Sequence, residues 1–234
     1  MIVDMDFYHV LNRGVDKRKI VMNDQDRKRF VADLFAMNNS LPVGNMNYHF
    51  ARSMDIGRPY RGEERKKLVQ IHGWCLMDNH YHLLISEEVE NGLSQFLKKL
   101  NMGYAKYFNE RYKRSGALFQ GKTKKVLIEH DAQFNYILHY IHLNPLDYLK
   151  GAQNWRIHNK DTKGDTWSTK SVLEYLSKYR WSSYLDYIGT KNFPEIVTTS
   201  EMSEGPAQYR AKCVRYLSAV AENRKEFDSA VTFE

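Results

Sequence analysis

Residues 77–85 read MDNHYHLLI, a short polar turn followed by a strongly apolar run. Two histidines in this stretch, His80 and His82, are separated by a single residue. Alternate residues of an extended strand point to the same face of a sheet, so we expect both imidazoles to project side by side. Asp78 and Asn79 are typical turn residues, which indicates the second arm of a β-hairpin. Two histidines on one strand face can hold a divalent metal ion, but packed or surface histidines give the same pattern.

Around this hairpin the chain alternates between strand and helix patterns. In order, the apolar spacing predicts a strand at 7–11, a helix capped by Asn23 and ending near 38–39, hairpin arms at 68–77 and 80–86, a helix at 92–115, a strand at 122–129 and a helix at 131–143. Residues 40–67 are polar and are predicted to form an inserted loop, with a short strand at 48–51. The first six elements follow the ferredoxin-like split βαβ order. The fold class is therefore α+β, an antiparallel sheet with helices on one face.

The C-terminal third is less regular. Residues 151–170 are polar and predicted to be a loop, and the aromatic segment 179–184 is expected to pack back on the main domain. Apolar residues at helical spacing near the C-terminus predict a small helix. We therefore predict one domain at 1–189, followed by a linker and a small helical extension at 190–234.

Composition narrows the function classes. The chain has 234 residues, of which 42% are hydrophobic, so a wholly disordered polymer is excluded. Its two cysteines argue against a disulfide scaffold or a cysteine-based zinc module and suit a reducing cytoplasm. We find neither the apolar core of a signal peptide nor an apolar window long enough for a spanning helix. We therefore expect a cytoplasmic protein without a membrane partner.

The formal net charge of +7 becomes informative because positive residues cluster between residues 106 and 125. Against the single acid Glu110, this segment contains Lys106, Arg111, Lys113, Arg114, Lys122, Lys124 and Lys125. Aromatic residues are interleaved with them. Basic side chains bind phosphates and aromatic rings stack on unpaired bases, so the segment indicates single-stranded or hairpin nucleic acid binding. The alternative is that the aromatic residues form helix core.

The predicted helix at 131–143 presents an apolar arc toward the sheet and, beside it, a polar arc that includes Tyr136, Tyr140 and Asn144. Tyr140 and Asn144 are four residues apart and therefore neighbours on the helix surface. Pro145 is expected to end the helix at Asn144 and to leave its side chain free to turn. A phenol beside a carboxamide oxygen, over a histidine pair, suggests a nucleophile next to a Mg²⁺ or Mn²⁺ site. The alternative is an amphipathic helix whose tyrosines cover the sheet edge.

Assembled in order, these residues resemble the REP-associated tyrosine transposases, relatives of the single-tyrosine transposases of small bacterial insertion sequences within the HUH nuclease superfamily. The resemblance runs from residue 7 to about 189. It rests on Asn12-Arg13-Gly14, MDNHYHLL, YAKYFNERYKRSGALFQGK, YILHYIHLNPL and YRWSSYLDYIG. Two positions depart from the family pattern. Asp78 stands where proline is usual, and Lys122 replaces an arginine, which loses a bidentate phosphate contact but keeps the charge.

The resemblance implies a single-stranded DNA transposase or endonuclease in which Tyr140 attacks phosphorus and forms a covalent 5′-phosphotyrosine link. It also implies that His80, His82 and Asn144 bind Mg²⁺ or Mn²⁺, and that the substrate is a DNA hairpin of a repetitive extragenic palindrome. The residues expected to bind this DNA are Asn12, Arg13, Lys106, Arg111, Lys113, Arg114, Gln120, Lys122, Lys124 and Lys125. We further expect a bacterial, nucleoid-associated protein that acts as a monomer or a homodimer.

Two other functions fit the same sequence. A non-catalytic hairpin-binding protein derived from a transposase would keep the basic segment without needing His80, His82 and Tyr140 together. A zinc-dependent hydrolase would use the histidine pair and would stay active after Tyr140→Phe. Within the transposase interpretation, Tyr136 is an alternative nucleophile because it lies one helical turn before Tyr140.

Overall fold

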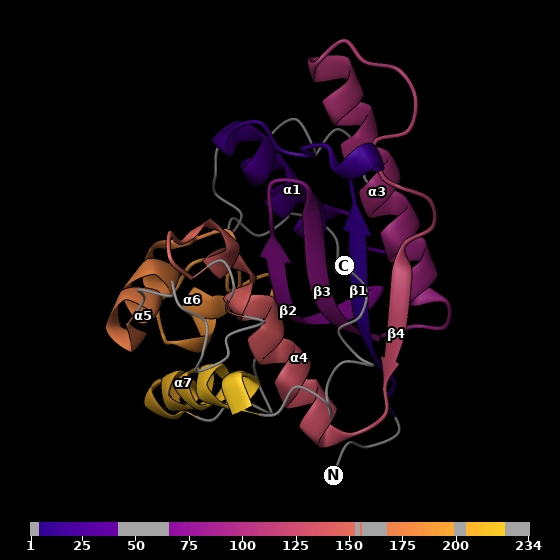
Figure 1. Cartoon of the computed structure of the whole chain (residues 1–234). Coiled ribbons are helices and arrows are strands. Elements are labelled where there is room, and N and C mark those ends of the chain that lie inside the picture. The colour runs from indigo at the N-terminus through magenta and orange to yellow at the C-terminus, as the bar shows by residue number, and fades with distance from the viewer. Residues whose placement is uncertain (1–4, 42–65, 153–154, 156–167, 199–204, 223–234) are drawn as a thin grey trace.

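The structure, a computed structural model, describes residues 5–41, 66–152, 155, 168–198 and 205–222. Its strands and helices are β1 (Phe7–Arg13), α1 (Asp24–Ala36), β2 (Val69–Leu76), β3 (His80–Glu87), α3 (Gly92–Arg111), β4 (Lys124–Ile128), α4 (Asp131–Leu143), α5 (Thr169–Lys178), α6 (Tyr184–Tyr187) and α7 (Pro206–Glu222) (Figure 1). The predicted insertion at 40–67, with its short strand, and most of the predicted loop at 151–170 lie outside the described residues. None of the helices in the described ranges is both long enough and apolar enough to cross a membrane.

A four-stranded antiparallel sheet forms the centre of the protein, with the strand order β2-β3-β1-β4. This is the ferredoxin-like arrangement predicted from the sequence, and it places β1 and β3 in the middle. In the register of these strands, His80 lies opposite Arg13 and His82 opposite Leu11. Leu11 lies opposite Lys124 on its other side. Residues directly opposite one another share a face of the sheet, so these side chains form rows from β3 toward β4.

Helices α1 and α3 cover one face of the sheet, but the prediction of helices on one face only is wrong, because α4 covers the other. Asn23 caps α1, because its side-chain oxygen accepts hydrogen bonds from the backbone N–H groups of Gln25 and Asp26. The core on this side includes Val10, Trp74, Tyr81, Leu83 and Ile85 of the strands, together with Phe30 and Phe96 of the helices. The buried strand residues on this face are thus overwhelmingly apolar.

The opposite face is covered by α4, whose bounds agree with the predicted helix at 131–143. Successive residues of a strand point to opposite faces, so the second core uses the other set of strand residues. This core includes Phe7, Cys75 and Leu84 of the strands, Phe134, Ile137, Leu138 and Ile141 of α4, and Tyr209, Cys213 and Leu217 of α7. The helix predicted in the C-terminal extension therefore exists as α7 and packs on α4. Figure 1 shows α5, α6 and α7 gathered beside α4.

The aromatic segment 179–184 packs back on the main domain, as predicted, and contacts the edge strand β2. The Leu76 N–H donates to the Trp181 carbonyl at 2.9 Å, and the Ser183 N–H donates to the Trp74 carbonyl at 3.0 Å. These bonds attach the chain after α5 to the sheet and fix the C-terminal helices beside α4. Helix α5 itself was not predicted.

Candidate active site

Three histidines lie close together on the face of the sheet that α4 covers. His80 and His82 of β3 have ring centroids 4.9 Å apart, with ring planes at 83°. A third histidine, His9 of β1, stacks on His82 with a centroid distance of 5.3 Å and an angle of 12°. Its Nε2 lies 3.0 Å from Nδ1 of His82. The predicted pairing of His80 and His82 on one face is therefore confirmed, and sequence reasoning missed His9.

Tyr140 of α4 faces this histidine group. Its ring centroid is 5.6 Å from that of His82 and 6.0 Å from that of His9, and both ring pairs are edge-on. Trp155 contacts the same tyrosine, with centroids 5.9 Å apart. Tyr140 is only 2% exposed and His82 is fully buried. The structure thus brings the predicted nucleophile to His82, one of the predicted metal ligands, in a closed site.

Tyr136 has different neighbours, although the sequence placed it on the same arc as Tyr140. Its ring centroid lies 4.9 Å from that of Tyr216 in α7. His139, between the two tyrosines in the sequence, stacks on Tyr209 of the same helix. Helix α7 therefore covers this side of α4. The two tyrosines, one helical turn apart on α4, therefore contact different elements.

Asn144 follows α4 directly and is fully buried. Its backbone keeps helical angles (φ −48°, ψ −38°) and starts a 3₁₀ helix at Asn144–Tyr148. The Asn144 Nδ2 donates a hydrogen bond to the Tyr140 carbonyl at 2.8 Å. The expectation that Pro145 frees this side chain is therefore wrong, although α4 does end at Leu143. The carboxamide is fixed one turn from Tyr140, and Oδ1 is its only atom with a lone pair for a metal ion.

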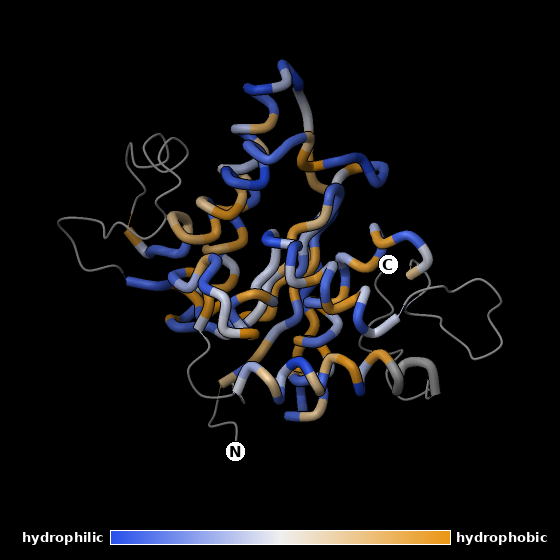
Figure 2. Tube along the Cα trace, turned by 90° about the vertical axis from the view of Figure 1, so that its left-hand side faces the viewer, coloured by the Kyte–Doolittle hydropathy of each residue, from blue (hydrophilic) through white to orange (hydrophobic). Residues whose placement is uncertain are grey.

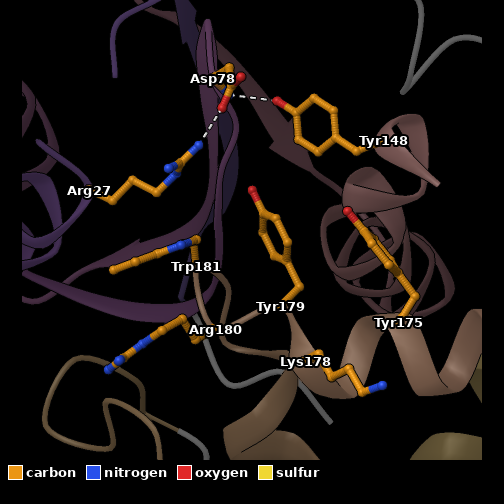
Figure 3. A pocket seen from close by; sticks show the side chains of 8 residues that line it. All are labelled: Arg27, Asp78, Tyr148, Tyr175, Lys178, Tyr179, Arg180 and Trp181. Atoms are coloured by element: carbon orange, nitrogen blue, oxygen red, sulfur yellow. Dashed lines mark hydrogen bonds and ion pairs between the residues drawn. The ribbon is translucent and has the colours of Figure 1, made fainter. Parts of the chain in front are cut away.

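Beside the turn before His80 lies a pocket of about 330 Å³, between α1, the hairpin and the chain that follows α5 (Figure 3). The Asp78 carboxylate in its wall pairs with Arg27 at 2.6 Å and with Lys19 at 3.2 Å. The Asp78 N–H donates to the Tyr148 hydroxyl at 2.7 Å. Burial raises the pKa of Tyr148, so its phenol is neutral. The unusual aspartate therefore ties the turn to α1 and to the 3₁₀ helix.

A second pocket, of about 140 Å³, is lined by Leu11, Asn12, Arg13, Gln120, Lys122 and Lys124. Most of these are predicted DNA-binding residues. The Gln120 N–H donates to the Arg13 carbonyl at 2.8 Å, which holds the loop before β4 against the end of β1. Because Arg13 lies opposite His80, this basic pocket adjoins the histidines. Asn12 is only 5% exposed and its Nδ2 donates to Thr123 at 3.0 Å, so this side chain is used inside the protein.

Of the other predicted DNA-binding residues, Lys106 and Arg111 lie in the last turns of α3, Lys113 and Arg114 follow it, and Lys125 lies in β4. The end of α3 protrudes from the rest of the molecule in Figure 1 and is largely hydrophilic in Figure 2. Lys106 and Lys113 are exposed. Arg111 lies 3.4 Å from the buried carboxylate of Asp26, and the hydroxyls of Tyr107 and Tyr112 also donate to that carboxylate. Tyr104, Phe108 and Phe119 are buried in the core. The aromatic residues of this segment therefore have the core role that was the alternative to base stacking.

The proposed ligand atoms belong to His80, His82 and Asn144, and their chemistry fits the ions predicted from the sequence. Two imidazole nitrogens and an amide oxygen suit Mn²⁺ well and Mg²⁺ less well. Among the described residues, no group of three or more His, Cys, Asp and Glu side chains is arranged to hold a metal ion. A metal ion on His80 and His82 would therefore need an oxygen ligand besides protein carboxylates, such as the predicted Asn144 or a substrate oxygen.

Residues 57–144 of the chain match the family model described as "Transposase IS200 like". This segment contains His80, His82, Tyr140 and Asn144, whereas β1 lies outside it. A solved structure described as "Structure of the REP associates tyrosine transposase bound to a REP hairpin" aligns with 86% of this chain and 91% of its own chain, at 10% sequence identity and a TM-score of 0.42. No curated protein matches the chain. The resemblance inferred from the sequence is thus confirmed over residues 57–144, which match the IS200-like transposase family.

Proposed function

We propose that this protein is a metal-dependent transposase that cleaves and rejoins single-stranded hairpin DNA through a covalent bond to Tyr140. The observation that carries the proposal is the meeting of Tyr140 with the histidine pair, at 5.6 Å between the ring centroids of Tyr140 and His82. The two parts come from β3 and α4, which are far apart in sequence. The family match covers both of them.

In this proposal His80, His82 and Asn144 hold a Mn²⁺ or Mg²⁺ ion. When bound, the ion offsets the negative charge that develops on the phosphate oxygens during attack. The Tyr140 hydroxyl loses its proton and its oxygen bonds to phosphorus while the bond from phosphorus to the 3′ oxygen breaks. The 5′-phosphate stays on Tyr140 and the released strand keeps a 3′-hydroxyl. A second 3′-hydroxyl can then reverse the step and join a new strand.

The basic pocket beside His80 is the proposed binding site for the phosphate backbone of the DNA. Arg13, Lys122 and Lys124 bring positive charge to the face of the sheet on which the histidines lie. Cationic side chains bind phosphates regardless of sequence, so this pocket would position a strand without selecting its bases. All of these residues belong to one chain, so cleavage needs no second copy of the protein. A DNA substrate also fits the expected location on the bacterial nucleoid.

The burial of the site favours a second candidate function, a non-catalytic hairpin-binding protein derived from a transposase. Tyr140 is 2% exposed and His82 is fully buried, so a phosphate reaches them only if covering side chains such as Trp155 move. A protein that only binds hairpins would need no such movement. The same basic pocket serves both candidates.

Covalent trapping separates these candidates. The protein is incubated with an end-labelled single-stranded hairpin and Mn²⁺ and then denatured, and the labelled protein is digested and mapped. We expect an adduct on Tyr140 that disappears in Tyr140→Phe and persists in the matched control Tyr136→Phe. Hairpin binding without any adduct would support the non-catalytic candidate. An adduct on Tyr136, or zinc-dependent cleavage that survives Tyr140→Phe, would overturn the proposed role of Tyr140.

A further inference from the structure

We infer that His9 and Asn79 are positioning residues for the proposed metal site, because each lies within hydrogen-bond distance of Nδ1 of one ligand histidine. The inference rests on the proposed function, since it concerns the ion that His80 and His82 would hold. Neither residue was expected to take part: Asn79 was interpreted only as a turn residue, and His9 only as part of a strand. Together they would set which nitrogen of each ligand histidine faces the ion.

For His80 the acceptor is an amide oxygen. The Asn79 Oδ1 lies 2.7 Å from Nδ1 of His80. The Nδ2 of the same amide donates to the Lys17 carbonyl at 3.2 Å, which fixes the orientation of the amide. An amide oxygen can only accept a hydrogen bond, so Nδ1 of His80 carries the proton. The lone pair that could coordinate a metal ion is therefore on Nε2.

For His82 the acceptor is another imidazole. Nε2 of His9 and Nδ1 of His82 are 3.0 Å apart, and one of the two must donate. If His9 donated, His82 as a neutral ring would carry its proton on Nε2 and could not bind an ion through that atom. Coordination through Nε2 requires that Nδ1 of His82 donates to His9. Both ligand histidines then share one tautomer, with the proton on Nδ1 and the lone pair on Nε2.

The strand register explains why His9 can do this. His9 lies opposite Leu84 and Leu11 lies opposite His82, so His9 and His82 are diagonal neighbours on one face of β1 and β3. Their rings stack at 12°, and His9 is only 2% exposed. An acceptor held this rigidly fixes the rotation of the ligand ring as well as its tautomer. Loss of such a second-shell partner typically weakens metal binding about 10- to 100-fold.

The test is a Mn²⁺ titration of the full-length protein without DNA, in which free Mn²⁺ is followed by electron paramagnetic resonance. His9→Phe keeps an aromatic ring but removes the acceptor, and we expect Mn²⁺ binding to weaken about 10- to 100-fold. His9→Gln, which can place an oxygen near the position of Nε2, should restore binding to within a few-fold of wild type. Asn79→Leu should weaken binding likewise, whereas Asn79→Asp should keep or tighten it because a carboxylate is a stronger acceptor.

A second measurement needs no variant and remains informative if a variant fails to fold. Nitrogen-15 NMR of the metal-free protein reports which ring nitrogen of each histidine is protonated. We expect Nδ1–H for both His80 and His82, and Nε2–H for either would overturn the inference. Unchanged Mn²⁺ affinity in folded His9→Phe and Asn79→Leu would overturn it too, even where wild type forms the DNA adduct. A wild-type protein that neither binds Mn²⁺ nor forms the adduct would instead refute the proposed function.

Discussion

The two faces of the central sheet bury different kinds of side chain, although the same four strands build both. Toward α1 and α3, β3 presents Tyr81 and Leu83, which join an apolar core. Toward α4, the alternate residues of the same strand are His80 and His82. Burying a polar group costs free energy unless hydrogen bonds compensate, so burial of the histidines makes this second face contribute less to stability. The face toward α1 and α3 thus carries an apolar core alone, whereas the face toward α4 combines an apolar core with the proposed site.

Histidine is concentrated in the layer between the sheet and α4. The strands contribute His9, His72, His80 and His82 to this layer, and α4 contributes His142, which lies near Gly73 of β2. His142 is fully buried and lies within hydrogen-bond distance of the hydroxyls of Tyr209 and Ser183, which links α4 to α7 and to the segment that borders β2. Burial lowers the pKa of His142. We therefore expect acid to destabilise the protein by protonating histidines of this layer.

The largest expected effect tests whether substitutions on the α4 face change activity without changing stability. The double variant His9→Leu/His82→Leu removes both partners of a buried hydrogen bond. We expect adduct formation to fall at least about a hundredfold, because a proposed ligand is lost. The free energy of unfolding should change by less than about 1 kcal/mol, since replacing both partners with apolar groups is nearly neutral. Adduct yield and urea unfolding measure the two effects, and a loss of several kcal/mol would make these histidines structural.

Leu83→Ala, on the other face of β3, should have the opposite profile. Leu83 is fully buried in the core with α1 and α3, so the substitution should lower the free energy of unfolding by roughly 2–5 kcal/mol. Adduct formation per folded molecule should stay at the wild-type level. Ile85→Val, which removes one methylene from the same core, provides a graded control at about 1 kcal/mol. An unchanged urea midpoint for Leu83→Ala would contradict the assigned role of this face.

Acid should destabilise the protein through the histidine layer. Burial lowers the pKa of His72 to about 4, whereas an unfolded histidine titrates near 6.5. Below pH 6.5 the unfolded chain binds a proton that the folded protein does not, so stability is full above this pH and is lost as the pH falls toward 4. The loss from this residue is on the order of 3 kcal/mol. Urea unfolding should give a lower free energy of unfolding at pH 5 than at pH 7. His72→Gln should reduce this difference between the two pH values. An equal difference in wild type and variant would show that His72 is not its cause.

The smallest expected effect concerns the basic pocket. Lys122→Gln removes one proposed phosphate contact, so hairpin affinity should fall a few-fold and the slope of log affinity against log salt should decrease by about 0.7 to 1. Lys178→Gln is the matched control, because the Lys178 charge is already paired with Glu174 at 2.7 Å. Fluorescence anisotropy between low and physiological salt gives both slopes. Equal slopes for Lys122→Gln and wild type would remove Lys122 from the proposed interface.

Local sequence patterns predicted most of the helices and strands that carry the candidate site. The helix at 131–143 and the hairpin arms were located to within a residue or two, because their apolar periodicity is strong and turn residues bound them. Period-two alternation then placed His80 and His82 on one face without knowledge of the rest of the sheet. The ferredoxin-like order followed from the sequence of elements.

What the sequence did not reveal depends on tertiary context. His9 is one histidine in an ordinary strand, and only the pairing of β1 with β3 places it beside His82. The sequence predicted Asn144 but not its fixed side chain, because the chain continues from α4 into a 3₁₀ helix and the side chain is hydrogen-bonded there. Helix α5 did carry a local signal: Ser168 and Ser171 form its capping box, and Val172 and Leu176 lie four residues apart on its buried side.

The central claim is that two histidines of β3 and the phenol of α4 serve one phosphate. A crystal structure of the Tyr140→Phe variant with Mn²⁺ and an uncleaved DNA hairpin tests it most directly, because anomalous scattering locates the ion. We expect the ion on Nε2 of His80 and His82, with the scissile phosphate between it and the ring at position 140. An ion held elsewhere, or a scissile phosphate out of reach of that ring, would contradict the claim.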